Sequence, residues 1–445
     1  MPKLVPEYLG RIAEDRKNII IRRSMEDISA IYPDMRKIVM DVREKGDEVL
    51  LAHYKKYKQD IRLDDLEVSH KEIDQAYNAT DAKIVDALKV AATNIEKFHK
   101  SQVEKEMWSI EVSEGITAGR LIRPLDCAGA YVPGGLASYP SSVLMTIIPA
   151  RVAGVRKVIA CTPPSKGMAV NPTTLVAAHI AGTDQIFKIG GPWAIASMAY
   201  GTSIVPKVDK IVGPGNKYVT CAKMIVFGEV DIDSPAGPSE VLIIADETAH
   251  PRLIAFDLLS QVEHDQEATA VLVTTSETLA QEVSEIIANE SPNLPRKDII
   301  ETALSRYSAI LIANTLDEAI NFSNSYAPEH LQIVTSDPYA ILPHIKHAGS
   351  IFLGPYAPVP AGDYASGTNH VLPTGRCARM FSGLSVDDFI KKPTFQYLSE
   401  KGLRSLADTI ITLAEAEGLP VHAMAIKERF PYSHETLMTL SHKEE

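Results

Sequence analysis

Residues 1–118 carry apolar side chains at intervals of three and four positions, with charged side chains between them. The segment DMRKIVMDVREKGDEVLLAHYKKYK, residues 34–58, is a typical example. This spacing places the apolar side chains on one face of a helix and leaves the charged side chains toward solvent. We therefore expect residues 1–118 to be mainly helical.

From about residue 120, short apolar runs rich in β-branched residues alternate with amphipathic stretches. One series of runs comprises VRKVIACT, DQIFKIG and DKIVGPG, and a second comprises EVLIIAD, AVLVTTS, SAILIANT, HLQIVTS and SIFLG. Strands that are apolar along their whole length and separated by helices are typical of buried parallel sheets. The pattern predicts an α/β protein with two related sheet units, whose ligands bind at the carboxyl ends of the strands. Residues from about 381 are expected to be helical with a polar tail.

The chain has 445 residues, enough for two or three domains, and its net charge of −12 argues against nucleic-acid binding. The four cysteines, Cys127, Cys161, Cys221 and Cys377, form no CxxC pair, so neither a disulfide framework nor a cysteine-only metal site is expected. The sequence shows no signal-peptide core and no uncharged apolar segment long enough for a membrane span. We expect a soluble, cytoplasmic protein.

Two adjacent ionisable residues, Glu329 and His330, follow a proline where an expected helix meets an expected strand, in SYAPEHLQIV. An imidazole titrates near neutral pH, and a neighbouring carboxylate can share its proton transfers. This pair can form a site only with partners from other segments.

Polar side chains that could contribute to a site occur in two further segments. In SQVEHDQ, Gln261 and His264 are three residues apart on an expected helix and so share a face, where they could form half of a metal site, although an ordinary polar helix end explains them as well. The glycine- and proline-rich segment 354–375 carries Asp363 and His370 and follows the last expected strand, where a loop is well placed for function. A long structureless connection is the alternative for this segment.

In TLAEAEGLPVHA, a helix is expected to end at Gly418, with Glu417 in its last turn and His422 just beyond. The helix dipole disfavours a carboxylate at this end, which suggests a cationic partner for Glu417, although a solvated glutamate tolerates the position. The glycine-rich segments AYVPGG, KIGGPW and VGPGNKYVT match neither GxGxxG nor a P-loop. They could expose backbone N–H groups to an anion or simply form tight turns.

Taken together, these segments resemble the histidinol dehydrogenase family. The similar blocks follow the order of that family and cover most of the chain, most closely from about residue 120 to 425. They are AGAYVPGGLASYPSSVLMTIIPARVAGV, PKVDKIVGPGNKYVT, IDSPAGPSEVLIIADE, SQVEH, YAPEHLQI, GDYASGTNHVLPTG and AEAEGLPVHA. The resemblance implies an enzyme that oxidises L-histidinol to L-histidine through L-histidinaldehyde, with zinc and two NAD, in the last step of histidine biosynthesis.

The resemblance also implies a zinc site, with one Zn²⁺ per subunit. By position, its ligands would be Gln261, His264, Asp363 and His422, and nitrogen and oxygen donors of this kind suit zinc. The family pattern implies that His422 is donated by the other subunit of a homodimer with shared active sites. These ligands would also contact the amino alcohol.

For the chemistry, the resemblance implies that Glu329 and His330 perform the acid–base steps. His330 would remove the alcohol proton and contact the substrate, and Glu329 would activate the water that is added to the aldehyde. Ser239 and Glu417 resemble substrate contacts of the family, and Glu417 would face the ammonium group of the substrate.

For NAD, Tyr131 and Asn216 match contacts of the family, whereas Trp193 stands where the family usually has a glutamine. An indole donates one hydrogen bond but accepts none, so the sequence leaves the effect of Trp193 on the cofactor open. Arg376 and Cys377 stand where small residues are usual and could change the choice of substrate.

The family fold implied by the resemblance has two incomplete Rossmann-like units, a helical N-terminal region and a short C-terminal arm. We expect the following divisions: an N-terminal arm at 1–20, a first α/β domain at 21–127 with 241–380, a second, NAD-binding domain at 128–240, and a C-terminal helical dimerisation arm at 381–445.

Two other activities are compatible with parts of the pattern. A related dehydrogenase of the same superfamily, such as one that oxidises a dihydroxypropane sulfonate, could use Arg376 to bind an anionic group. A zinc hydrolase could use Glu329 as its base, but it would not need the glycine-rich turns. A non-catalytic protein would be expected to lack part of the catalytic set, which is complete here.

Overall fold

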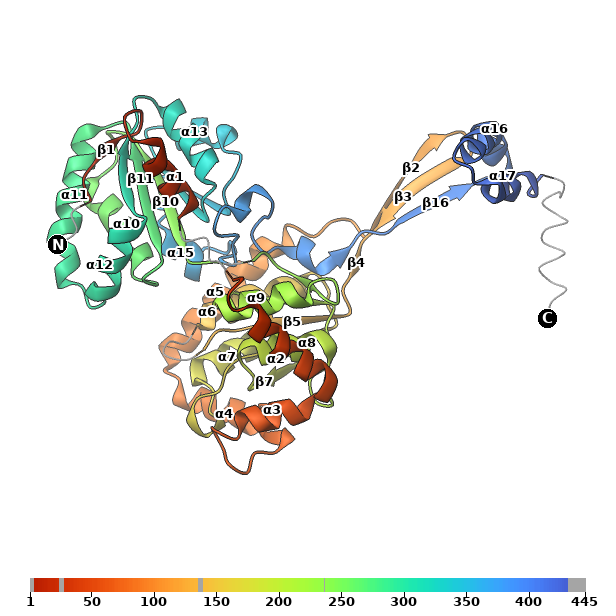
Figure 1. Cartoon of the computed structure of the whole chain (residues 1–445), viewed down its shortest axis with the longest axis horizontal. Helices are drawn as coiled ribbons and strands as arrows, with labels where there is room; N and C mark the ends of the chain where they lie inside the picture. The colour runs from red at the N-terminus through yellow and green to blue at the C-terminus, as the bar shows by residue number, and fades with distance from the viewer. Residues whose placement is uncertain (1–3, 24–27, 135–138, 236, 431–445) are drawn as a thin grey trace. The chain divides into compact units, whose positions relative to one another are not determined.

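The computed structural model describes residues 4–23, 28–134, 139–235 and 237–430. The chain divides into two compact units, the first comprising residues 1–103 with 125–389 and the second comprising residues 104–124 with 390–445. The first unit contains two parallel sheets, and the second contains antiparallel strands and two helices (Figure 1). Among the described residues, none of the helices combines the length and apolar character needed to cross a bilayer.

A six-stranded parallel sheet holds the second series of apolar runs. Its strands, in spatial order, are β1 (Glu7–Tyr8), β12 (Ala309–Ile312), β11 (Thr269–Thr274), β10 (Glu240–Ala245), β13 (His330–Val334) and β14 (Ser350–Leu353). The central strands β10, β11 and β13 are buried along their whole length. The parallel sheet predicted from the apolar runs is therefore confirmed, and Glu7–Tyr8 of the expected N-terminal arm form its edge strand.

Helices cover both faces of this sheet, which explains why its strands are continuously apolar. On one face, Val241 and Ile243 pack with α10 (Pro251–Val262), α11 (Glu277–Glu290) and α12 (Lys297–Arg306). On the other face, Leu242 and Ile244 pack with α13 (Leu316–Tyr326) and α1 (Glu14–Arg22). Figure 1 shows both helices beside this sheet.

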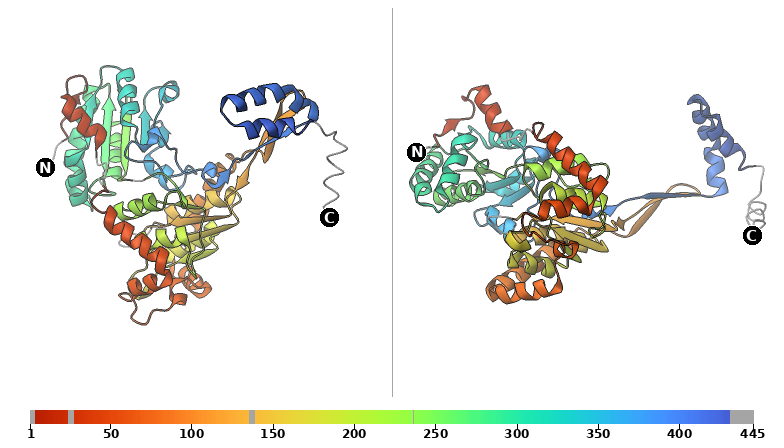
Figure 2. Two further views of the ribbon diagram at one scale, coloured as in Figure 1. Left: turned by 45° about the vertical axis from the view of Figure 1, so that its right-hand side comes forward. Right: turned by 60° about the horizontal axis from the view of Figure 1, so that its bottom comes forward.

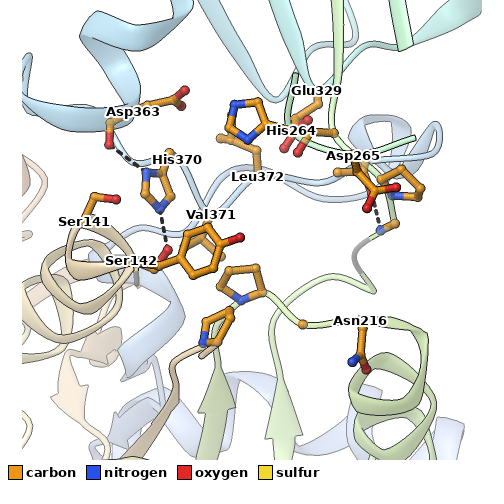
Figure 3. Close-up of a pocket in the computed structure, with 18 of the residues that line it drawn as sticks. Ser141, Ser142, Asn216, His264, Asp265, Glu329, Asp363, His370, Val371 and Leu372 are labelled. Atoms are coloured by element: carbon orange, nitrogen blue, oxygen red, sulfur yellow. Dashed lines mark hydrogen bonds between the residues drawn. The ribbon is translucent and has the colours of Figure 1, made fainter. Parts of the chain in front are cut away.

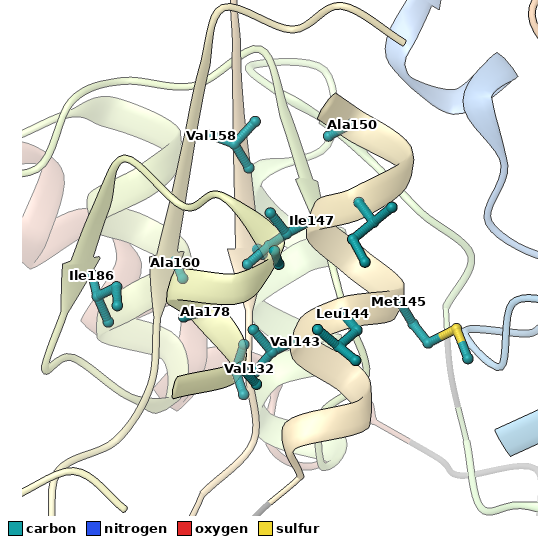
Figure 4. Close-up of a cluster of buried hydrophobic side chains, with 14 of the residues drawn as sticks. Val132, Val143, Leu144, Met145, Ile147, Ala150, Val158, Ala160, Ala178 and Ile186 are labelled. Atoms are coloured by element: carbon teal, nitrogen blue, oxygen red, sulfur yellow. The ribbon is translucent and has the colours of Figure 1, made fainter. Parts of the chain in front are cut away.

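A five-stranded parallel sheet holds the first series. Its strands are β7 (Gln185–Phe187), β6 (Lys157–Cys161), β5 (Cys127–Tyr131), β8 (Lys210–Val212) and β9 (Asp231–Ile232). One face packs on α6 (Pro140–Val152) and α7 (Pro172–Ala181), where Val143, Ile147 and Val158 form part of a buried apolar cluster (Figure 4). The other face packs on α8 (Gly191–Tyr200) and α9 (Lys217–Val226).

The N-terminal helices complete the covering of the five-stranded sheet. They are α2 (Tyr32–Lys45), α3 (Asp47–Tyr54), α4 (His70–Ala79) and α5 (Ala82–Lys100). Val39 and Leu50 pack in the α8–α9 cluster, and Leu88 and Ile95 pack in the α6–α7 cluster. Figure 2 shows the same placement of these red and orange helices from two further directions. The expected division, which grouped residues 21–127 with 241–380, therefore differs from the packing of these helices.

The second unit is built on a sheet that the sequence pattern did not predict. Strands β2 (Met107–Ser113) and β3 (Ile116–Leu121) form a hairpin through Gly115, and β16 (Thr394–Leu398) pairs with β3. Two short strands, β4 (Arg123–Pro124) and β15 (Ile390–Lys391), pair beside it, and α16 (Glu400–Ala416) and α17 (Pro420–Lys427) follow. The expectation of helix was wrong at 107–113, 116–118 and 394–398. Trp108, Ile110 and Val112 alternate with other side chains, which is the period of a strand.

Candidate active site

A cavity of about 580 Å³ in the first unit is lined by segments of both parallel sheets. The five-stranded sheet contributes the carboxyl ends of β5 and β8, through Tyr131 and Asn216. The six-stranded sheet contributes its amino ends, because Ser239 precedes β10 and His330 begins β13. The expectation that ligands meet the carboxyl ends of strands thus fits one sheet, whereas the other presents the opposite edge.

Most of the residues singled out from the sequence meet in this cavity (Figure 3). Those that line it are Tyr131, Asn216, Ser239, Gln261, His264, Glu329, His330 and Asp363. Trp193, Arg376 and Cys377 are not among its lining residues. Side chains from segments that are widely separated in the sequence therefore form one polar site.

The imidazole of His330 is buried between two carboxylates. Its Nδ1 lies 3.0 Å from the main-chain oxygen of Glu240 and 3.4 Å from Oε2 of Glu329. Its Nε2 lies 3.7 Å from Oδ1 of Asp363 and has no hydrogen-bond partner. A carbonyl oxygen only accepts hydrogen bonds, so Nδ1 carries the hydrogen, and Nε2 is the nitrogen available to a ligand.

Burial and charge act on the pKa of His330 in opposite directions. Burial of the ring lowers the pKa, but the negative charges of Glu329 and Asp363 outweigh this effect and raise it to about 9. The pocket without ligands therefore favours the protonated ring at neutral pH. Compensation of the Asp363 charge by a bound cation would favour the neutral ring.

Gln261, His264 and Asp363 all line the cavity and offer donors for a metal ion. Helix α10 ends at Val262, so His264 lies beyond its end rather than on the helix as expected, but both residues still reach the cavity. The buried Oε1 of Gln261 has no hydrogen-bond partner. Within the described residues, no three His, Cys, Asp or Glu side chains are grouped to hold a metal. Gln261 adds an amide oxygen to the donors of His264 and Asp363 in this cavity. An amide oxygen, an imidazole and a carboxylate fit Zn²⁺.

The other two residues carried over from the family, Glu417 and His422, belong to the second unit. Glu417 is the C-terminal cap of α16 and is followed by Gly418 with φ 71°, as the sequence predicts for a helix end. His422 lies in the first turn of the next helix, α17. Both side chains are exposed and therefore accessible to a ligand or another subunit.

His370 also lines the cavity, although neither the sequence pattern nor the family resemblance indicates a role for it. Its Nδ1 lies 2.8 Å from the main-chain oxygen of Asp363, and its Nε2 lies 3.2 Å from Oγ of Ser142, as Figure 3 shows. Burial lowers the pKa of this imidazole. The sequence signal was its place seven residues after Asp363 in the same glycine-rich segment.

Of the three residues predicted to contact NAD, Tyr131 and Asn216 line the cavity, whereas Trp193 does not. The hydroxyl of Tyr131 accepts a hydrogen bond of 3.1 Å from the Gly191 N–H, and the side chain of Asn216 caps the N-terminus of α9. Trp193 instead stacks on His53, with ring centroids 3.6 Å apart. The indole therefore joins the first turn of α8 to α3.

Comparisons with known proteins show which proteins this chain resembles in sequence and structure. The family model described as histidinol dehydrogenase matches residues 21–430. The chain is 50% identical over 427 residues to histidinol dehydrogenase of Methanococcus maripaludis, covering 96% of this chain and 100% of the relative. It is 51% identical over 424 residues to that of Methanosarcina mazei, covering 95% and 97%. The crystal structure of histidinol dehydrogenase from Elizabethkingia anophelis superposes with a TM-score of 0.90 at 40% identity, covering 97% and 99% of the two chains.

The two parallel sheets and the site they share are thus those of an α/β oxidoreductase. More narrowly, the chain belongs to the histidinol dehydrogenase family. The resemblance inferred from the sequence blocks is confirmed.

Proposed function

We propose that this protein oxidises L-histidinol to L-histidine through L-histidinaldehyde, with two NAD, as the last step of histidine biosynthesis. The observation that carries the proposal is the buried His330, which lies between the carboxylates of Glu329 and Asp363 and whose Nε2 has no hydrogen-bond partner, in a cavity lined by both sheets. The family and the names of the relatives support the same substrate.

His330 takes the proton of the substrate hydroxyl at Nε2, because Nδ1 already donates to the Glu240 carbonyl. Glu329 receives the proton of the water that adds to the aldehyde, so that the imidazole does not serve every proton transfer alone. NAD supplies the hydride acceptor for each of the two oxidations. Turning an alcohol into an acid requires both oxidations and the intervening addition of water.

Gln261, His264 and Asp363 would hold one Zn²⁺ together with the partner subunit's His422. Bound zinc supplies a positive centre that orients the imidazole and amine of the substrate. Ser239 and the cavity wall beside it would position the same ligand, and Glu417 would pair with its ammonium group. These side chains therefore bind and orient, while Glu329 and His330 move protons.

Tyr131 and Asn216 would contact NAD at the carboxyl ends of β5 and β8. Trp193 acts indirectly in this proposal: its stacking on His53 joins α3 to the first turn of α8, where the Gly191 N–H donates to the Tyr131 hydroxyl.

The proposed enzyme is a cytoplasmic homodimer with shared sites. In the second unit, several large apolar side chains are exposed, which is typical of a surface that another subunit covers. They include Trp108, Ile110, Val112, Tyr397, Leu413, Val421 and Met424.

The test is metal analysis of the purified protein followed by an assay of NADH formation. We expect zinc, and formation of NADH with L-histidinol in a ratio of about two per substrate consumed, because a primary alcohol loses two hydrides on the way to an acid. A dihydroxypropane sulfonate is the control substrate. Turnover of the sulfonate without turnover of L-histidinol would contradict the proposal, and so would metal-dependent hydrolysis without NAD.

A further inference from the structure

A buried ion pair lies directly behind the proposed acid–base residues. Arg23, which follows α1, forms a salt bridge with Glu240 at the start of β10. Arg23, Glu240 and Glu329 are only 6%, 2% and 5% exposed. Charges buried to this extent are costly unless each has a partner.

Glu240 and Glu329 are joined by two reciprocal hydrogen bonds. The N–H of Glu240 donates to Oε2 of Glu329 at 2.8 Å, and the N–H of Glu329 donates to Oε1 of Glu240 at 3.1 Å. The main-chain oxygen of Glu240 accepts from Nδ1 of His330. One residue therefore contacts both members of the proposed catalytic pair.

Arg23 supplies a positive charge beside the carboxylates of Glu240 and Glu329. Like charges in a buried site disfavour simultaneous ionisation unless a positive group compensates one of them. The guanidinium also donates to the main-chain oxygen of Tyr326 at 2.9 Å and lies 3.7 Å from the centre of that ring. Arg23 thereby holds the end of α13, just before Glu329 in the chain, against the start of β10.

We infer that Arg23 is a positioning residue for the oxidation: by pairing with Glu240, it holds the carboxylate of Glu329 beside His330 and fixes the start of β13. Arg23 acts through Glu240, and neither residue is among those that line the cavity. The inference rests on the proposed function, because it assigns Glu329 and His330 their roles in that reaction.

A double-mutant cycle tests the charge compensation. Arg23→Met leaves Glu240 unpaired next to Glu329, and we expect kcat with L-histidinol to fall by about 100-fold while KM changes by less than about twofold. The double variant Arg23→Met/Glu240→Gln removes both charges, so kcat should return to within about tenfold of wild type. Arg23→Lys, which retains a cation, should also keep most of kcat.

The matched control is Lys210→Met. Lys210 is a buried cation paired with Asp231 and Asp388 at the amino end of β8, away from the cavity. Its loss should lower the melting temperature but leave kcat unchanged. If Arg23→Met behaves like this control, the inference is wrong. It is also wrong if the double variant is as slow as Arg23→Met.

Two precautions keep the outcomes separate. If Arg23→Met does not fold, the double variant and Arg23→Lys carry the test, and a 100-fold loss of kcat in both folded proteins overturns the inference. The wild-type protein is assayed first with L-histidinol and NAD. Absence of wild-type turnover contradicts the proposed function, whereas normal turnover by a folded Arg23→Met variant contradicts only the role of Arg23.

Discussion

At the scale of single residues, the proposed proton transfer depends on which ring nitrogen of His330 is free to accept a proton. The Glu240 carbonyl fixes the hydrogen on Nδ1 of His330, so Nε2 is the nitrogen that can accept a proton. In His330→Asn, the amide can still donate to this carbonyl, but it has no basic nitrogen. We expect kcat to fall by about 10²- to 10⁴-fold, with zinc content and melting temperature retained. His344→Asn, at an exposed position, is the control. Wild-type rates in His330→Asn would place the base elsewhere.

The residues of the cavity could be predicted from the sequence to different degrees. Glu329, His330 and Asp363 were recognisable by side-chain chemistry, and the family resemblance assigned their roles. Arg23 was not recognisable, because an arginine among other charged residues at the end of a helix shows no sign that it will be buried. Its partner Glu240 lies far away in the sequence, and only the pairing of β10 with β13 brings the two glutamates together.

At the scale of secondary-structure elements, α3 and α8 meet through the stacked rings of His53 and Trp193. Burial, aided by the charge of Lys56, lowers the pKa of His53 to about 4. As the pH falls below the unfolded value of about 6.5, the unfolded chain gains a proton that the folded chain refuses. The contribution of His53 to stability is therefore present above about pH 6.5 and is lost progressively toward pH 4.

His53→Phe keeps a ring at this contact but removes the titration. We expect the wild-type protein to lose more unfolding free energy than the variant between about pH 7.5 and pH 4.5, measured by urea denaturation. Because the ring is only half-buried, solvent screening should limit the difference to about 1 kcal/mol. Equal losses in the two proteins would show that His53 does not titrate differently on folding.

Strands and helices could be predicted from the sequence where the pattern of apolar side chains allowed only one interpretation. The apolar runs of β10, β11 and β13 are buried on both faces, so their pattern was unambiguous. The hairpin of β2 and β3 was missed because β2 is exposed throughout and lies after a long helical region. Its apolar residues alternate on a surface rather than in a core, so burial did not mark them as a strand.

At the scale of the whole molecule, the division into two units determines what one chain can supply. The first unit brings Gln261, His264 and Asp363 to one cavity, whereas His422 belongs to the second unit and is exposed. Sequence patterns predicted the α/β class, but they could not assign the N-terminal helices to a sheet. That assignment depends on long-range packing of side chains such as Val39 and Leu88, which periodicity does not encode.

A mixing experiment tests whether active sites are shared between subunits. His330→Asn and His422→Asn should each be nearly inactive, and the second should also contain less zinc. If His422 serves the other subunit, a mixed dimer has one site with both histidines intact and one with neither. Random exchange at equal concentrations makes about half of the dimers mixed, so about a quarter of wild-type activity should return.

Mixing His330→Asn with Glu329→Gln is the control. Both residues lie at the start of β13 in the same chain, so each site of a mixed dimer lacks one of them and no intact site can form. Recovery in neither mixture, after subunit exchange has been verified, would mean that His422 serves its own chain.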